Sequence, residues 1–200
     1  MTEQKRSDLE HQLVAAGYDG LFLYGERSRA DALWARGGNQ PALEGIIADA
    51  TTSLQTKFLA AELLRAKGVR LSSAAAPVCA EAYAAALAST SETSGNPWRL
   101  NGNVWGFVQH ADDPGVLGRV LIGLGRVAVP HLVKLLSDDG AIIFEGSREA
   151  TTGNKLQLRV KDFAAYYLSQ IEGIAVPLRE AHAERDAEIE KLKQAVARQP

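Results

Sequence analysis

One sequence motif occurs twice in this chain, once in each half. The first copy starts at Leu54 and reads LQTKFLAAELL, and the second starts at Leu158 and reads LRVKDFAAYYL. The shared positions pair Leu54 with Leu158, Lys57 with Lys161, Ala60 with Ala164, Ala61 with Ala165, and Leu64 with Leu168. An apolar stretch with a proline at its start precedes each copy, at Pro41 and at Pro130. A helix pair of this kind buries its apolar face against neighbouring pairs, so the repeat predicts an all-α protein of stacked helical hairpins.

The composition supports a helical core. Apolar residues make up 46% of the 200 residues and aromatic residues only 6%. Alanine and leucine dominate the apolar set, whereas a sheet sandwich needs more valine, isoleucine, threonine and aromatic residues. The net charge of −2 counts against general attraction to phosphates, so a nucleic acid is not the expected partner. The single cysteine, Cys79, excludes an internal disulfide and a cysteine-rich metal site.

The two copies of the helix pair differ in the length of the turn between their helices. Pro41 and Leu54 are 13 positions apart, whereas Pro130 and Leu158 are 28 apart, so the second copy carries 15 additional residues. Within Ile142–Leu158 the pattern alternates, turns at a Thr-Thr-Gly-Asn stretch and alternates again, which predicts a small β-hairpin. Insertions in repeat arrays fall on one face, which is often the binding face.

The segment Gly123–Asp139 reads GLGRVAVPHLVKLLSDD and resembles the first helix of a HEAT-like repeat, with Val160–Ile171 as the second helix. The resemblance covers residues 41–68 and 125–173. It implies a HEAT-like α–α stack, and such arrays serve as scaffolds, inhibitors and occasionally enzymes. The hairpin insertion is a departure from the minimal repeat of that family.

We expect one domain over residues 1–200, with two halves, 1–90 and 103–176, on either side of a polar loop. A charged C-terminal helix over 177–200 either caps the stack or docks on a partner. The first residues lack the apolar core of a signal peptide, and no membrane-spanning segment is expected. These features predict a cytoplasmic protein, although a chain trimmed of a signal or lipid anchor would have the same sequence.

One group of residues has the atoms that a metal site needs. His110, Asp112 and Asp113 stand next to Pro114, and an imidazole with two carboxylates can bind a metal. The same aspartates also suit the start of a helix that Pro114 opens, and this second interpretation accounts for the residues more simply. The chain has no phosphate-binding loop and no nucleophile elbow, so we predict neither an enzyme nor a cofactor.

The leading hypothesis is a non-catalytic protein-binding or scaffold module that uses a helical surface and the insertion. An immunity or inhibitor protein that covers a partner's active site is one form of it. Two other readings stay open: an enzyme similar to the HEAT-like DNA glycosylases, and a structural subunit that assembles through its C-terminal helix. The aromatic candidates either form an interface or cover the open edge of the stack. The candidate interaction residues are Trp98, Trp105, Phe107, Phe144, Glu145, Arg148 and Asn154.

Overall fold

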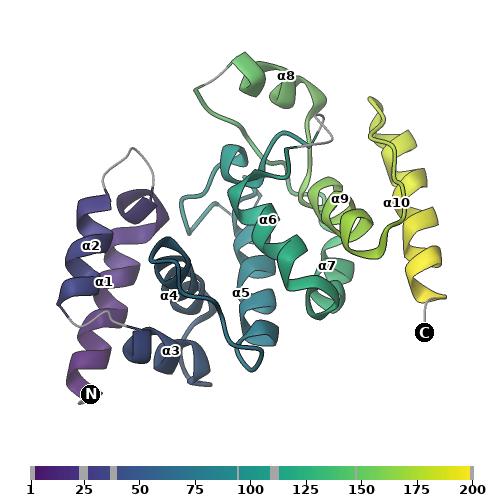
Figure 1. Cartoon of the computed structure of the whole chain (residues 1–200). Coiled ribbons are helices and arrows are strands. Elements are labelled where there is room, and N and C mark those ends of the chain that lie inside the picture. Colours follow the sequence, from purple (N-terminus) through teal and green to yellow (C-terminus); the bar gives the residue numbers. More distant parts are fainter. Residues whose placement is uncertain are drawn as a thin grey trace. The chain divides into compact units, whose positions relative to one another are not determined.

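A computed structural model describes residues 3–22, 27–36, 40–93, 95–108, 113–146 and 148–198. These residues form helices joined by turns, and none of them lies in a named strand, so the predicted all-α class is confirmed for this part of the chain. The chain divides into two compact units, Met1–Ala86 and Leu87–Pro200. The boundary lies within helix α5 (Ala76–Ser89), which Figure 1 shows in blue-teal.

The first unit is built around helix α4, which packs against α1 and α3. Every residue of α4 from Thr56 to Leu64 is buried. Helices α3 and α4 form the expected hairpin, and Ser53 caps α4 because its hydroxyl accepts a hydrogen bond from the Thr56 amide at 3.2 Å. Besides the start of α5, the helices of this unit are α1 (Glu3–Phe22), α2 (Arg27–Ala35), α3 (Gln40–Ala48) and α4 (Leu54–Ala66).

The second unit is built around helix α9, which packs against α6, α7 and α10. Its core contains large aromatic side chains, and Trp105, Phe163 and Tyr167 are fully buried. The charged C-terminal helix, α10, belongs to this unit. The elements after α5 are η1 (Gly102–Trp105), α6 (Gly115–Leu124), η2 (Gly125–Ala128), α7 (Val129–Leu135), α8 (Arg148–Leu156), α9 (Val160–Glu172) and α10 (His182–Ala197).

The two sequence copies occupy corresponding places in the two units. The first copy forms α4, which packs on α3, and the second forms α9, which packs on α7. The alanine pairs of both copies are buried, as close helix packing requires. The repeated lysines, Lys57 and Lys161, are both buried. A lysine can pack its four-carbon stem against apolar neighbours, and the Lys161 ammonium also meets two carboxylates, at 2.6 and 2.9 Å.

The β-hairpin predicted over Ile142–Leu158 is not present in the described residues. The arm expected to return as a strand forms helix α8 instead, and one antiparallel bridge joins Ala141 to Arg159. Beyond that bridge the extended segment packs against α8. Gly153 allows this helix to approach the Phe144 ring closely, because a Cβ at Gly153 would lie 2.7 Å from Cδ2 of Phe144. The side chain of Asn154 then supplies the hydrogen bonds that a second strand would have made.

One segment of the described residues, Gly115–Leu135, is long and apolar enough to cross a membrane by length and composition, with a mean hydropathy of 1.5. The sequence reading had expected no such segment. The segment contains α6, η2 and α7, and the backbone bends at Gly125, where φ is +65°. No second segment in the described part of the chain passes the same test, so nothing there suggests a multi-span membrane protein.

Candidate functional site

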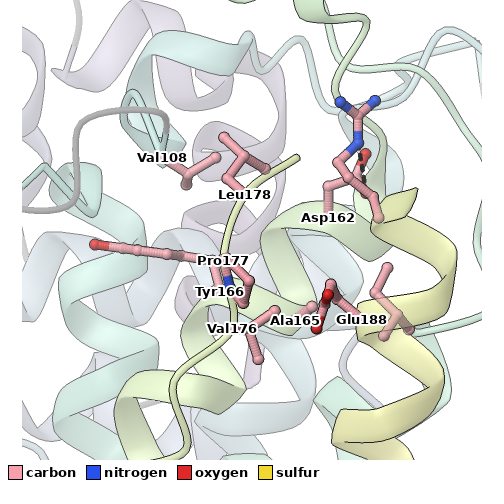
Figure 2. A pocket seen from close by; sticks show the side chains of 10 residues that line it. Val108, Asp162, Ala165, Tyr166, Val176, Pro177, Leu178 and Glu188 are labelled. Atoms are coloured by element: carbon pink, nitrogen blue, oxygen red, sulfur yellow. Dashed lines mark ion pairs between the residues drawn. The ribbon is translucent and has the colours of Figure 1, made fainter. Parts of the chain in front are cut away.

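The second unit contains a pocket between α9, the segment that follows it and α10. Its cavity volume is about 20 Å³, and it opens to solvent. Figure 2 shows Val108 and Leu178 close together on one side of it, and Asp162 and Glu188 on the other. Most of the lining is aliphatic or aromatic, and the lining residues are Val108, Asp162, Ala165, Tyr166, Val176, Pro177, Leu178, Arg185, Glu188 and Ile189.

Helix α9 supplies one wall of this pocket. Asp162, Ala165 and Tyr166 follow one another at helical spacing, so they share one side of the helix. Asp162 is the third residue of α9 and accepts a hydrogen bond from the Arg159 amide at 2.9 Å, which fixes the first turn. The ring of Tyr166 packs edge-on against Tyr167, with ring centroids 5.7 Å apart. The wall is therefore held to the buried core of the unit.

The opposite wall comes from the connection to α10 and from α10 itself. Gly173 ends α9 in the left-handed conformation (φ +66°), which favours glycine, and lets the chain turn back. Residues 174–181 then run without helix, and Leu178 is among the exposed large apolar residues of the chain. On α10, Arg185 and Ile189 are one turn apart and both are buried. The pocket thus has an exposed apolar residue, Leu178, at its edge and buried residues, Arg185 and Ile189, at its floor.

Arg185 is the residue that holds these walls together. Its guanidinium donates to the carbonyl oxygens of Arg179 at 3.0 Å, Glu180 at 2.9 Å and Leu156 at 2.9 Å. Its Nε lies 3.3 Å from a carboxylate oxygen of Asp162, within ion-pair range, although the geometry does not make a hydrogen bond. Arg185 is only 2% exposed, and this burial lowers the pKa of its guanidinium below the ordinary value.

A charge cluster of six residues extends from Arg185 beneath the pocket. Arg159 lies 3.1 Å from Asp139, 3.0 Å from Asp162 and 2.8 Å from Asp186. Hydrogen bonds from Arg159 and then Lys161 lower the pKa of Asp186 to about 2. The cluster consists of Asp139, Arg159, Lys161, Asp162, Arg185 and Asp186, so it has three carboxylates and three cations. Because these charges cancel, the cluster does not make a basic groove.

Both carboxylates of the pocket have cationic partners. Asp162 lies beside Arg159 and Arg185, and Glu188 lies beside Arg179 and Lys191. Among the described residues, no three histidine, cysteine or acidic side chains are placed to hold a metal ion. An apolar cavity with a few fixed polar groups is the usual form of a ligand or side-chain pocket.

The aromatic residues singled out in the sequence lie largely in the core of the second unit. Trp105 is fully buried and donates from Nε1 to the Thr90 hydroxyl at 2.8 Å. Phe107, which is half-buried, stacks on Phe144 with ring centroids 5.0 Å apart. Phe144 in turn lies 6.1 Å from Phe163, ring centroid to ring centroid. The rings of Trp105 and Phe144 are thus enclosed and provide packing rather than exposed surface.

Three of the other candidate interaction residues are more accessible. Glu145 is exposed, and Trp98 and Asn154 are half-buried. Arg148 begins helix α8. The structure therefore brings Phe107, Phe144, Glu145 and Asn154 together around the insertion.

Most of the proposed metal cluster, His110 to Asp112, lies outside the described residues. Asp113 is described, and its carboxylate accepts from the Gly115 amide at 3.2 Å, at the start of α6. Asp113 therefore lies at the start of the helix, but Pro114 is its N-cap and Gly115 its first residue, so Pro114 does not open the helix as predicted. The Asp113 side chain also lies 3.9 Å from Arg119 on the same helix.

Sequence reasoning did not find Arg185 or its partner Asp162. The sequence predicted a charged helix over 177–200 and did not single out Arg185. Three buried residues of α10, Arg185, Ile189 and Leu192, follow at i, i+4 and i+7. That spacing is the signal of a packed helical face, and it places one arginine in an otherwise apolar stripe.

Comparison with known proteins gives no relative. No family model, no curated protein and no solved structure matches the chain. The HEAT-like resemblance therefore stays a prediction from the motif.

Proposed function

We propose that this chain is a protein-binding module, and that the pocket between α9 and α10 receives an apolar side chain of the partner. The observation that carries the proposal is the combination of an aliphatic and aromatic lining with an exposed edge at Leu178. The cavity volume is only about 20 Å³, so the pocket suits one small apolar group better than an extended cofactor. Buried anchors of this kind dominate the energetics of protein interfaces.

The rigidity of the walls supports the same function. Arg185 fixes the segment at Arg179 and Glu180 to the end of α8 at Leu156 through backbone carbonyls. A pocket held in shape before binding loses less conformational entropy when a partner enters it. The position of Glu188 and Arg179 on the rim, 3.5 Å apart, adds polar groups that can orient a partner's backbone.

The insertion supplies a second contact in this proposal. Its extended segment turns Ile143 and Glu145 outward, and both are exposed, while Ile142 and Phe144 are buried. This alternation follows from the period of two in an extended chain. The surface around Ile143 and Glu145 then offers one apolar and one acidic group to the same partner.

The HEAT-like architecture is part of the proposal. The pairs α3–α4 and α7–α9 each start near a proline and end in a helix with a buried alanine pair. Such pairs act elsewhere as scaffolds and inhibitors, which is in line with a module that works by surface contact.

The test is selection of peptides on the full chain from a random displayed library. We expect the enriched peptides to share an apolar anchor residue, and we expect Leu178→Asp to weaken their binding at least tenfold, because it puts a charge on the apolar edge. The matched control is Val14→Asp, which changes another exposed apolar residue, on α1 of the first unit. Enriched peptides that bind the Leu178→Asp variant as tightly as the wild type would refute the pocket as the site.

The insertion needs a test that keeps the fold. Deletion of residues 146–154 would also remove Asn154, which is hydrogen-bonded to the buried Phe144, so it would disturb the core. Ile143→Asp changes only an exposed side chain. We expect it to weaken binding of a full-length partner, and unchanged binding would limit the interface to the pocket.

A further inference from the structure

A larger cavity lies in the first unit, lined by α3, the last turn of α4, the connection to α5 and the start of α5. We call it the α3–α5 cavity. Its volume is about 240 Å³, against about 20 Å³ for the pocket between α9 and α10. Seven of its nine lining residues have aliphatic side chains, and the two polar ones are Glu44 and Ser72. The cavity is therefore an apolar space with one charged group.

Helix α3 supplies the wall that carries this charge. Glu44, Ile47 and Ala48 stand at i, i+3 and i+4, so they share one side of the helix. Ile47 is buried, whereas Glu44 and Ala48 are exposed. This side of α3 thus leads from a buried apolar floor to a mouth where the carboxylate meets solvent.

The connection between α4 and α5 supplies the opposite wall, and the chain's own hydrogen bonds hold it. Near its start, the Val69 amide donates to the Leu64 carbonyl at 3.0 Å. Near its end, the Ser72 hydroxyl accepts from the Ala75 amide at 3.2 Å. Ala74 and Ala75 line the cavity on this side with single methyl groups, which leave the space unfilled. The wall keeps its shape without an occupant, which lowers the entropic cost of binding one.

The size of the cavity limits what it can hold. A cavity of roughly 150 Å³ with apolar walls can bind benzene, so a cavity of about 240 Å³ has room, by proportion, for about ten non-hydrogen atoms. That is one aromatic ring with a short substituent. An apolar space with few polar groups is the usual form of a small-molecule site.

The charge at the mouth selects the sign of the occupant. Glu44 accepts a hydrogen bond from the Gln40 side chain at 2.8 Å, and within the described residues no cation pairs with its carboxylate. Helices α3 and α5 contain no lysine or arginine. Arg65 and Lys67, at the end of α4, are paired with other carboxylates, and Arg70 does not line the cavity. The carboxylate therefore favours a ligand that brings its own positive charge.

We propose that the α3–α5 cavity binds a small organic cation, a primary amine on an apolar body of about ten non-hydrogen atoms. The body occupies the aliphatic interior, and the ammonium group donates to the Glu44 carboxylate at the mouth, where it keeps part of its hydration. An anion of the same shape would meet a like charge there, and a neutral molecule would gain only the apolar contacts. This site lies in the first unit and does not depend on the pocket between α9 and α10.

The experiment is titration of the isotope-labelled full chain at neutral pH with phenethylamine, phenethyl alcohol and phenylacetate, followed by amide NMR. We expect the amine to shift amides within residues 44–78 with a Kd of roughly 0.1–1 mM, which is ordinary for a ligand of this size. The alcohol should bind roughly three- to fivefold more weakly, because an exposed ion pair contributes little, and phenylacetate should not saturate. Glu44→Gln should bind the amine and the alcohol equally. Ala48→Phe should weaken both at least fivefold, because its ring takes up their space.

The matched controls are Glu81→Gln on α5 and Ala66→Phe at the end of α4, which change an exposed carboxylate and an exposed alanine that do not line the cavity. Both should bind the amine as the wild type does. Equal affinity of the wild type for the amine and the alcohol, tighter binding of phenylacetate, or no saturation by the amine at about ten times the expected Kd would overturn the proposal. Amide shifts confined to the second unit would overturn it as well. Leu178→Asp should leave amine binding unchanged, so this result is independent of the proposed function.

Discussion

Asn154 holds Phe144 by two hydrogen bonds between its side-chain amide and the Phe144 backbone. Its Oδ1 accepts from the Phe144 amide at 2.8 Å, and its Nδ2 donates to the Phe144 carbonyl at 2.9 Å. Asn103 does the same for the next residue, Glu145, at 3.0 and 2.7 Å. Successive residues of an extended chain present their backbone groups to opposite edges. Two asparagine side chains therefore occupy the places of two neighbouring strands.

The first prediction concerns Asn154. Asn154→Ala removes both hydrogen bonds and leaves the Phe144 amide and carbonyl without these partners, so we expect the free energy of unfolding to fall by about 1–3 kcal/mol. Urea denaturation followed by circular dichroism measures this change. Thr152→Ala, at an exposed position of the same helix, is the control and should stay within about 0.5 kcal/mol of the wild type. An Asn154→Ala variant as stable as the control would contradict the clamp.

Helix positions in this protein could be predicted from the sequence where several local signals indicated the same helix. The hairpin of α3 and α4 has a proline in its first turn, a Ser53 cap and an apolar stripe, and each of these acts over a few residues. The repeated motif also placed α9 correctly, because the alanine pair and the leucines keep helical spacing.

The structure of the insertion and of the pocket could not be predicted from the sequence, because both depend on contacts between residues far apart in the chain. Residues Ile142 to Glu145 do alternate between buried and exposed. However, Phe144 and Glu145 pair with the side chains of Asn154 and Asn103, and a periodicity does not show that an amide side chain will replace a strand. Likewise, the burial of Arg185 depends on carbonyls at Leu156 and Glu180, which are brought near it only by the folded chain. Local pattern cannot supply contacts of this kind.

The second prediction concerns Arg185. Arg185→Met keeps the approximate volume but removes the hydrogen bonds to four backbone carbonyls and one cation of the buried cluster. We therefore expect the free energy of unfolding to fall by about 3 kcal/mol or more. Hydrogen exchange should then show faster exchange in α10 than in α9, because α10 loses its attachment first. Lys191→Met, a change at an exposed position of α10, is the matched control and should leave both rates unchanged. Equal protection of α10 in both variants would argue against Arg185 as the link.

The third prediction concerns the stability of the protein at low pH. The pKa of Asp186 is lowered from 3.8 to about 2 by hydrogen bonds from Arg159 and Lys161, and the pKa of Asp139 is also lowered, first by its hydrogen bond to Lys161. A carboxylate with a lowered folded pKa contributes stability that is present above its unfolded pKa and is lost as the pH falls toward its folded pKa. We therefore expect the urea midpoint to fall between about pH 4 and pH 2.

The variant for this test is Asp186→Asn, which should be less stable at neutral pH and should show a shallower decline over the same acid range. Glu190→Gln changes an exposed carboxylate on the same helix and should keep the slope of the wild type. A slope that is the same in Asp186→Asn and in the wild type would mean that other carboxylates cause the acid response.

The fourth prediction compares two glycines of α6. A Cβ at Gly118 would lie 2.3 Å from Cε1 of Tyr167, whose ring is fully buried and whose hydroxyl donates to the Trp105 carbonyl, so the ring cannot move aside without breaking that bond. We expect Gly118→Ala to lower the free energy of unfolding by about 1–3 kcal/mol.

A Cβ at Gly123 would meet nothing within 4 Å, and the position is exposed. Gly123→Ala should therefore raise stability by about 0.5–1 kcal/mol, because alanine favours the helix. Urea denaturation of both variants measures the difference, and since the substitution and the helix are the same, opposite signs identify the contact between α6 and α9 as the cause.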